Sequence, residues 1–269
     1  MWGFLLPTLH RIILDKKASS KNSYIIQSSG PVMDKVFQSL LDICSIDAKI
    51  TSKRDIDGIE NTVVKRWDHW LLYISTQENK QQAKVLWKFI DGHKEIKTYL
   101  KQAIQEIREY LLALVKDNDR TKEYKDQFII LKRSAPPEFY QADGDAENKT
   151  YGSTRRSIQG LNETASYLNK KQINTKVFEP GAYTIIEQIQ IFNECRGVIG
   201  VRGAEFSNLI WMKPRAKAIM LLPSNLYSYS IPQAFAEIMD LDFHILKTYG
   251  GKHPTLEPKL LYNIIKNNA

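Results

Sequence analysis

Residues 197–211 read GVIGVRGAEFSNLIW, and this stretch decides which fold the sequence predicts. Its first five residues are all apolar or glycine, as in a strand that is buried on both faces of a sheet. The segment from Ala204 onward has the apolar spacing of a helix, and Gly203 stands where the chain turns between the two. A buried strand that runs directly into a helix is the repeating unit of a parallel α/β sheet.

The same unit recurs on both sides of this stretch. Short apolar runs predict further strands, and amphipathic runs predict helices between them. The predicted strands are residues 128–131, 175–178, 218–222 and 243–246, and the predicted helices are residues 162–168, 185–192, 204–211, 232–239 and 257–265. This succession predicts a doubly wound, Rossmann-like lobe with a parallel sheet.

The N-terminal part of the chain has a different pattern. Residues 2–14, 32–43 and 80–114 have helical periodicity, residues 23–29 form a candidate strand, and residues 48–61 read as polar turns. Residues 116–126 are almost wholly charged and polar, which suits an exposed connection between lobes. We therefore expect two α/β lobes, residues 1–120 and 121–269, of which the N-terminal lobe is small or incomplete.

Composition narrows the class of protein. With 43% hydrophobic and 25% charged residues, the chain has the balance of a soluble globular protein. Its two cysteines, Cys44 and Cys195, have no partner at metal-ligand spacing, so no metal site is expected. The net charge of +8 suits nucleic acid, an anionic membrane or an acidic substrate, but no nucleic-acid recognition motif is present. Since no apolar run reaches the roughly 18 residues of a membrane span, we expect a protein that is soluble or peripheral to a membrane.

Arginines follow the first strand of the predicted C-terminal sheet. Arg133 comes directly after that strand, and Arg155 and Arg156 follow at the end of the next loop. A guanidinium at the end of a parallel strand can hold a diphosphate, because its planar fork matches two phosphate oxygens. The alternative is that these side chains are ordinary solvated charges.

The turn after the strand at residues 197–201 is the second candidate. Gly203 and Ala204 would let a phosphate or ribose approach the backbone, and helix N-termini offer unpaired N–H groups to anions. Many such turns need a glycine for steric reasons alone, which is the alternative. Pro223 ends the next predicted strand and would flank the base or ribose.

Several segments resemble glycosyltransferase family 61, which includes plant β-1,2-xylosyltransferases, animal O-linked N-acetylglucosaminyltransferases and bacterial capsule or lipopolysaccharide enzymes. The resemblance is carried by residues 177–180, 187–192, 200–204 and 208–211, and by the pairs at 132–133, 155–156 and 162–163. It implies a GT-B-like α/β fold with two Rossmann-like lobes and parallel sheets. It also implies a sugar-nucleotide donor such as a UDP-sugar, no cofactor, no metal requirement and inversion at the anomeric carbon.

The resemblance also implies roles for particular residues. Arg133, with Arg155 or Arg156, would hold the pyrophosphate. The donor pocket would be shaped by Gly203, Ala204 and Asn208. The family commonly has a histidine at the position of Arg202, which here keeps a contact to an anion but not the chemistry of an imidazole.

Inverting transfer also needs a general base for the acceptor hydroxyl. Asp68 and His69 are the candidates, because they lie in the aromatic group at residues 67–73 and aromatic rings stack on sugar faces. The alternative is that the tryptophans of this group are core and His69 lies on the surface.

With the roles that the resemblance implies, these features predict an inverting, metal-independent glycosyltransferase that acts on a glycan or lipid-linked acceptor in surface polysaccharide synthesis. It would be cytoplasmic, either free or peripheral on the inner face of a membrane whose anionic lipids attract a basic surface. A non-catalytic member of the same fold that binds sugar nucleotides or glycans is the first alternative. A basic nucleic-acid-binding protein is the second.

Overall fold

The structure is a computed structural model, and it describes residues 9–18, 24–28, 30–52, 94–115, 118–135, 153, 156–223, 231–248, 251 and 253–266. The chain divides into two compact units, Met1–Lys116 and Asp117–Ala269. Each unit has its own buried apolar side chains.

The first unit contains a short parallel β-α-β arrangement. Strands β1 (Tyr24–Gln27) and β2 (Ala48–Thr51) pair in parallel, and α3 (Pro31–Ile43) connects them. Helix α3 starts behind Gly30, whose φ of 98° favours glycine, and has proline in its first turn, where a missing N–H costs no hydrogen bond. Helix α2 (His10–Lys17) packs against α7 (Lys94–Leu114).

Strand β2 corrects one sequence prediction. Residues 48–51 were expected in a polar turn, but they form a strand that pairs with β1 over its whole length. None of the four side chains is fully buried, so the apolar alternation that would reveal a strand is weak here. Hydrogen bonds to β1, which lie outside the local sequence, decide the conformation.

The second unit is built on a five-stranded sheet in which every neighbouring pair is parallel, as predicted. The strand order is β4-β3-β5-β6-β7. From β3 the chain first adds β4 on one side, and then crosses to the other side of β3 to add β5, β6 and β7 in turn. The direction in which strands are added therefore reverses at the boundary between β3 and β5. Open α/β sheets bind ligands at the carboxyl ends of the strands beside such a reversal. The strands are β3 (Phe128–Leu131), β4 (Thr175–Phe178), β5 (Gly197–Val201), β6 (Lys217–Pro223) and β7 (Asp242–Thr248).

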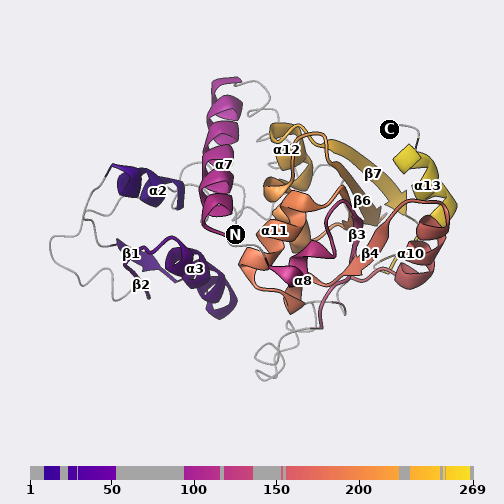
Figure 1. The fold of residues 1–269 in the computed structure, drawn as a ribbon, viewed down its shortest axis with the longest axis horizontal. Coiled ribbons are helices and arrows are strands. Elements are labelled where there is room, and N and C mark those ends of the chain that lie inside the picture. The colour runs from indigo at the N-terminus through magenta and orange to yellow at the C-terminus, as the bar shows by residue number, and fades with distance from the viewer. Residues whose placement is uncertain are drawn as a thin grey trace. The chain divides into compact units, whose positions relative to one another are not determined.

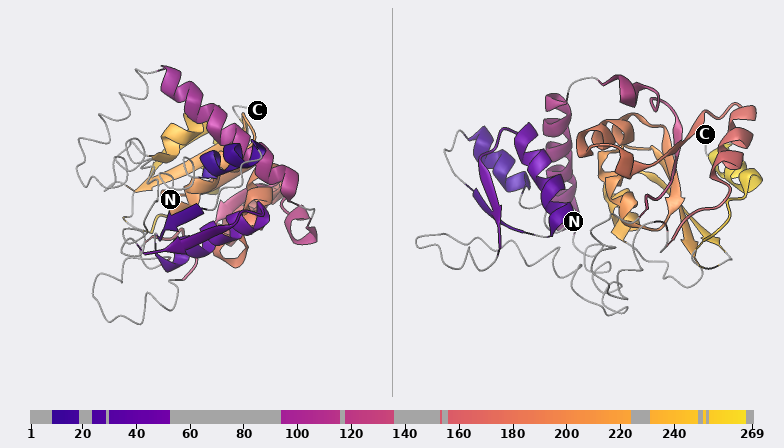
Figure 2. Two further views of the ribbon diagram at one scale, coloured as in Figure 1. Left: turned by 90° about the vertical axis from the view of Figure 1, so that its left-hand side faces the viewer. Right: turned by 90° about the horizontal axis from the view of Figure 1, so that it is seen from below.

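Helices cover both faces of this sheet, as the doubly wound prediction requires (Figure 1). Helices α10 (Leu161–Lys170) and α13 (Pro258–Lys266) pack together on one face. The other face carries α11 (Ile185–Glu194), the 3₁₀ helix η5 (Ala204–Trp211) and α12 (Ile231–Ile238), with the short turn η4 (Pro180–Ala182) ahead of α11. The right-hand view of Figure 2 shows the strands between these two layers.

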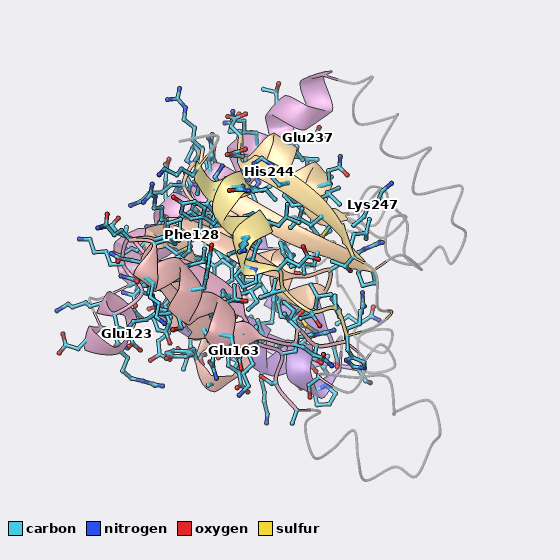
Figure 3. The ribbon with its side chains drawn as sticks, turned by 90° about the vertical axis from the view of Figure 1, so that its right-hand side faces the viewer. Glu123, Phe128, Glu163, Glu237, His244 and Lys247 are labelled. Carbon is cyan, nitrogen blue, oxygen red and sulfur yellow. The ribbon has the colours of Figure 1, made fainter. Side chains whose placement is uncertain are left out.

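Alternating residues of the strands supply the two cores. Phe128 and Ile130 of β3 point to the α10 and α13 face, which is turned toward the viewer in Figure 3. On the opposite face Phe206 of η5 lies against Gly200, where an added Cβ would stand 2.9 Å from its ring. Gly200 is therefore needed for packing. The predicted helix at residues 204–211 keeps its bounds but has the tighter 3₁₀ geometry.

The segment at 116–126 is a second correction. It was expected to be an exposed connection, but it contains helix α8 (Asp119–Lys122), and Thr121 and Tyr124 are buried. The ring of Tyr124 packs edge-on against Phe178, with centroids 5.1 Å apart. The highly charged local sequence predicts exposure. It does not indicate the contact of Tyr124 with Phe178, because Phe178 lies more than fifty residues away in the sequence.

Candidate functional site

A partly buried ion pair lies at the reversal between β3 and β5. Arg133 follows β3, and Glu205 lies in the first turn of η5, which follows β5. Arg133 Nε donates a hydrogen bond of 2.7 Å to Glu205 Oε1, and the two side chains are only 9% and 18% exposed. The predicted arginine therefore lies at the predicted turn, with an acidic partner that the sequence alone did not indicate.

Both side chains of this pair lie directly over Gly203. A Cβ on Gly203 would overlap Glu205 Oε2 and would stand 3.4 Å from Arg133 Cζ. The backbone of Gly203 is extended, with φ −170°, so its conformation does not require glycine. The close approach of Glu205 favours glycine instead, because an added methyl would displace the end of that side chain.

The pair leaves hydrogen-bonding capacity unused. Arg133 Nη1 and Glu205 Oε2 are both buried, and neither has a hydrogen-bond partner among the residues that the structure describes. Buried polar atoms are nearly always paired in folded proteins. Two such atoms at the carboxyl ends of neighbouring strands are an arrangement suited to a ligand.

A second arginine reaches the same strand end. Arg156 Nη1 donates a hydrogen bond of 2.7 Å to the carbonyl oxygen of Arg202, the first residue after β5. The segment that carries Arg156 is held by a parallel bridge between Gln159 and Thr255. Of the arginines predicted for the site, Arg133 and Arg156 are thus both brought to the Gly203 turn.

Arg202 itself is partly buried beside this turn. Burial lowers the pKa of its guanidinium from the ordinary value, although arginine remains protonated at neutral pH. Its backbone N–H donates to Leu221 O of β6, which continues the sheet by one residue. The cation therefore stands where the strand ends.

A neighbouring ion pair reduces the positive charge near the site. Lys132 Nζ lies 2.8 Å from Glu179 Oε2 at the carboxyl end of β4. The hydrogen bond from Lys132, with another from Ser134, holds the pKa of the Glu179 carboxyl below its usual range. Since Glu179 and Glu205 offset two cations, the edge is less positive than the sequence suggested.

Asn208 is used inside the protein. Its Nδ2 donates to Gln188 Oε1 of α11 at 3.0 Å, and its Oδ1 accepts from Trp211 Nε1 at 3.1 Å. Asn208 is buried; its bond to Gln188 ties η5 to α11, and its bond to Trp211 lies within η5. In the structure it therefore joins two helices of the unit.

Pro223 ends β6, toward the edge of the sheet that β7 forms. It is paired in register with Thr248, the last residue of β7. The Oγ1 of Thr248 is buried without a hydrogen-bond partner in the described part of the chain. Thr248 was not predicted as a site residue, and its place at a strand end is the one signal in the sequence that could have found it.

The remaining predicted residues have no side chain to place. Arg155, Asp68 and His69 lie outside the described residues, and only the backbone of Ala204 is described. Over the ranges that the structure covers, His, Cys, Asp and Glu side chains form no group of three that could hold a metal ion. None of the helices described there has the length and apolar character needed to cross a lipid bilayer.

The parallel, doubly wound sheet with a polar cluster at its reversal point is the architecture of a Rossmann-like, ligand-binding α/β protein. Residues 3–219 match the family described as glycosyltransferase 61, and the match covers most of the chain. The chain therefore belongs to glycosyltransferase family 61 and is a glycosyltransferase, with a sugar donor and an acceptor as its partners. No curated protein matches the chain.

Proposed function

We propose that this chain is an inverting glycosyltransferase that works without a metal ion and takes its sugar from a nucleoside-diphosphate sugar. The acceptor is a glycan or a lipid-linked glycan of surface polysaccharide synthesis. The observation that carries the proposal is the meeting of Arg133, Arg156 and the Gly203 turn at the reversal between β3 and β5. A dispersed set of arginines would not support it.

The diphosphate is best accommodated at the end of β5. Arg156 and Arg202 bring positive charge there, and the first amides of η5 follow Gly203 directly. Guanidinium groups and helix N-termini stabilise the charge that develops as a nucleoside diphosphate leaves. These groups can take the place that a divalent cation has in metal-dependent enzymes.

In this proposal the fold is GT-B-like, and the first unit serves the acceptor. Asp68 or His69 would accept the proton of the attacking hydroxyl, as predicted from the sequence. Peripheral contact with an anionic inner membrane face would bring lipid-linked acceptors close, since the net charge is +8.

A thermal-shift panel tests the donor class. The purified chain is heated with UDP, GDP, CDP and ADP, and with common sugar derivatives of each, in the presence of EDTA. A ligand that binds only the folded state raises the melting temperature. We expect one base to give a clear shift in EDTA, and Arg156→Ala to reduce that shift strongly.

Absence of any shift with every nucleotide would contradict the proposal. A shift that appears only after magnesium is added would contradict metal independence alone. Inversion is tested separately, by NMR assignment of the anomeric configuration of the first-formed product.

A further inference from the structure

Arg133 and Glu205 present a matched donor and acceptor rather than a purely cationic surface. Among the described residues, Arg133 Nη1 is a donor without an acceptor and Glu205 Oε2 is an acceptor without a donor. Both atoms lie within 3.6 Å of the point where a Cβ on Gly203 would stand. The two atoms therefore lie on the same side of the Gly203 backbone, close enough together for one ligand atom to be within hydrogen-bonding reach of both.

The chemistry of that atom follows from what the two groups can do. Arginine only donates hydrogen bonds, and an ionised carboxylate only accepts them. A phosphate oxygen could accept from Arg133 but would be repelled by the Glu205 carboxylate. A hydroxyl both donates and accepts, so it satisfies the two groups together.

We propose that Arg133 and Glu205 recognise a hydroxyl group of the sugar nucleotide, on its ribose or on the transferred sugar. This inference rests on the proposed function, and it deepens it by assigning Arg133 to a hydroxyl instead of the pyrophosphate. Glu205 becomes a residue that selects the donor. The Arg133 side chain is 9% exposed and the Glu205 side chain is 18% exposed, so the pair lies just beneath the surface at the strand ends.

The depth of the pair explains why it would discriminate. A site built to hydrogen-bond a hydroxyl rejects the analogue that lacks it, because its buried groups are then left unpaired. From the strength of hydrogen bonds to charged groups, removal of the recognised hydroxyl should weaken binding about 10- to 100-fold.

The test uses the nucleoside diphosphate with the largest thermal shift, its 2′-deoxy and 3′-deoxy forms, and the best sugar derivative. Affinities are measured by calorimetry for the parent and for Glu205→Gln, in which an amide can still accept from Arg133 Nε. If the hydroxyl is on the ribose, the parent rejects one deoxy form about 10- to 100-fold, and the variant loses most of this preference. If the hydroxyl is on the sugar, the variant instead loses the added affinity of the sugar derivative.

Two variants keep the test decisive. Glu205→Asp retains the charge but withdraws the carboxylate by one methylene, and it should lose the same preference. Glu179→Gln makes the same chemical change in the Lys132 pair at the end of β4, and the preference should stay intact.

Three results would overturn the inference. In the first, Glu205→Gln keeps the full preference for the hydroxyl. In the second, the variant binds every ligand more tightly by one common factor, which would mean that Glu205 only offsets the charge of Arg133. In the third, the parent binds diphosphates but distinguishes neither the deoxy forms nor the sugar derivative, which leaves the proposed donor class standing without this subsite.

Discussion

Two glutamates occupy comparable places in the second unit, but Glu187 is buried with its oxygens fully hydrogen-bonded whereas Glu205 is partly buried and, among the described residues, is not. Glu187 lies in the first turn of α11, after β4, and Glu205 lies in the first turn of η5, after β5. Both Glu187 oxygens accept two hydrogen bonds each, from Asn118 and Arg120 on one and from the Thr184 N–H and hydroxyl on the other. Within the described part of the chain, Glu205 accepts one hydrogen bond, from Arg133, and its buried Oε2 has no partner.

The difference teaches how a structural carboxylate can be told from one available to a ligand. Burial alone would raise the pKa of Glu187, but the hydrogen bonds from Thr184 and the Arg120 charge outweigh it and lower that pKa. A side chain with all its bonds filled contributes to folding and has no capacity left for a substrate. The unfilled oxygen of Glu205 marks the other case.

The largest expected effect comes from removing Glu187, the carboxylate whose hydrogen bonds are all filled. Glu187→Ala removes the capping box of α11 and leaves Asn118 without its carboxylate partner. We expect the free energy of unfolding to fall by about 2–4 kcal/mol, measured by urea denaturation. A loss below about 0.5 kcal/mol, the range of ordinary surface substitutions, would show that saturation does not indicate a structural role.

Asn208 extends the comparison to a neutral side chain. Asn208→Ala would leave Trp211 Nε1 buried without its acceptor and would cut the link to Gln188. We expect a loss of about 1–3 kcal/mol in the same denaturation experiment. An unchanged midpoint would mean that Asn208 is free for the donor pocket that the sequence predicts.

Gly203→Ala tests the position of Glu205, the carboxylate with an unfilled oxygen. The added methyl would overlap Glu205 Oε2, so the carboxylate must move away from its place over the turn. We expect a loss of about 1 kcal/mol, since the end of a flexible side chain can shift. In a double-mutant cycle with Glu205→Gln, the two changes should be non-additive because they share one contact. Strict additivity would place Glu205 away from Gly203.

The smallest effect concerns pH. Because the folded state lowers the pKa of Glu187, the stability it contributes is present above the unfolded value of 4.5 and is lost as pH falls through the folded pKa. The stability difference between the parent and Glu187→Gln should therefore be constant near neutral pH and shrink as the pH falls below 4.5. Melting temperatures across this range measure it, and a difference that stays constant would exclude an ionised Glu187.

Much of the second unit could be predicted from local sequence. The strand at residues 197–201 is wholly apolar, and the neighbouring strand β6 is largely so. This composition predicts burial on both faces of the sheet. Arg133 and Gly203 were predicted for the site because each directly follows a strand. The position of a residue at a strand end is a local property.

The partners of these residues could not be predicted in the same way. Thr184, three residues before Glu187, is the local signature of a capping box, but nothing local indicates that Glu205 pairs with Arg133. The strand at 48–51 and the buried Tyr124 were missed for a related reason. Pairing with β1 makes residues 48–51 a strand, and packing against Phe178 buries Tyr124.

The sequence by itself determined the α/β class, the parallel strands and the strand ends where charge collects, because these depend on the apolar and polar pattern of short segments. Only the tertiary structure decided the strand order and the pairing of Arg133 with Glu205 over Gly203. Those features depend on which distant segments become neighbours when the sheet reverses direction, and no local pattern specifies that.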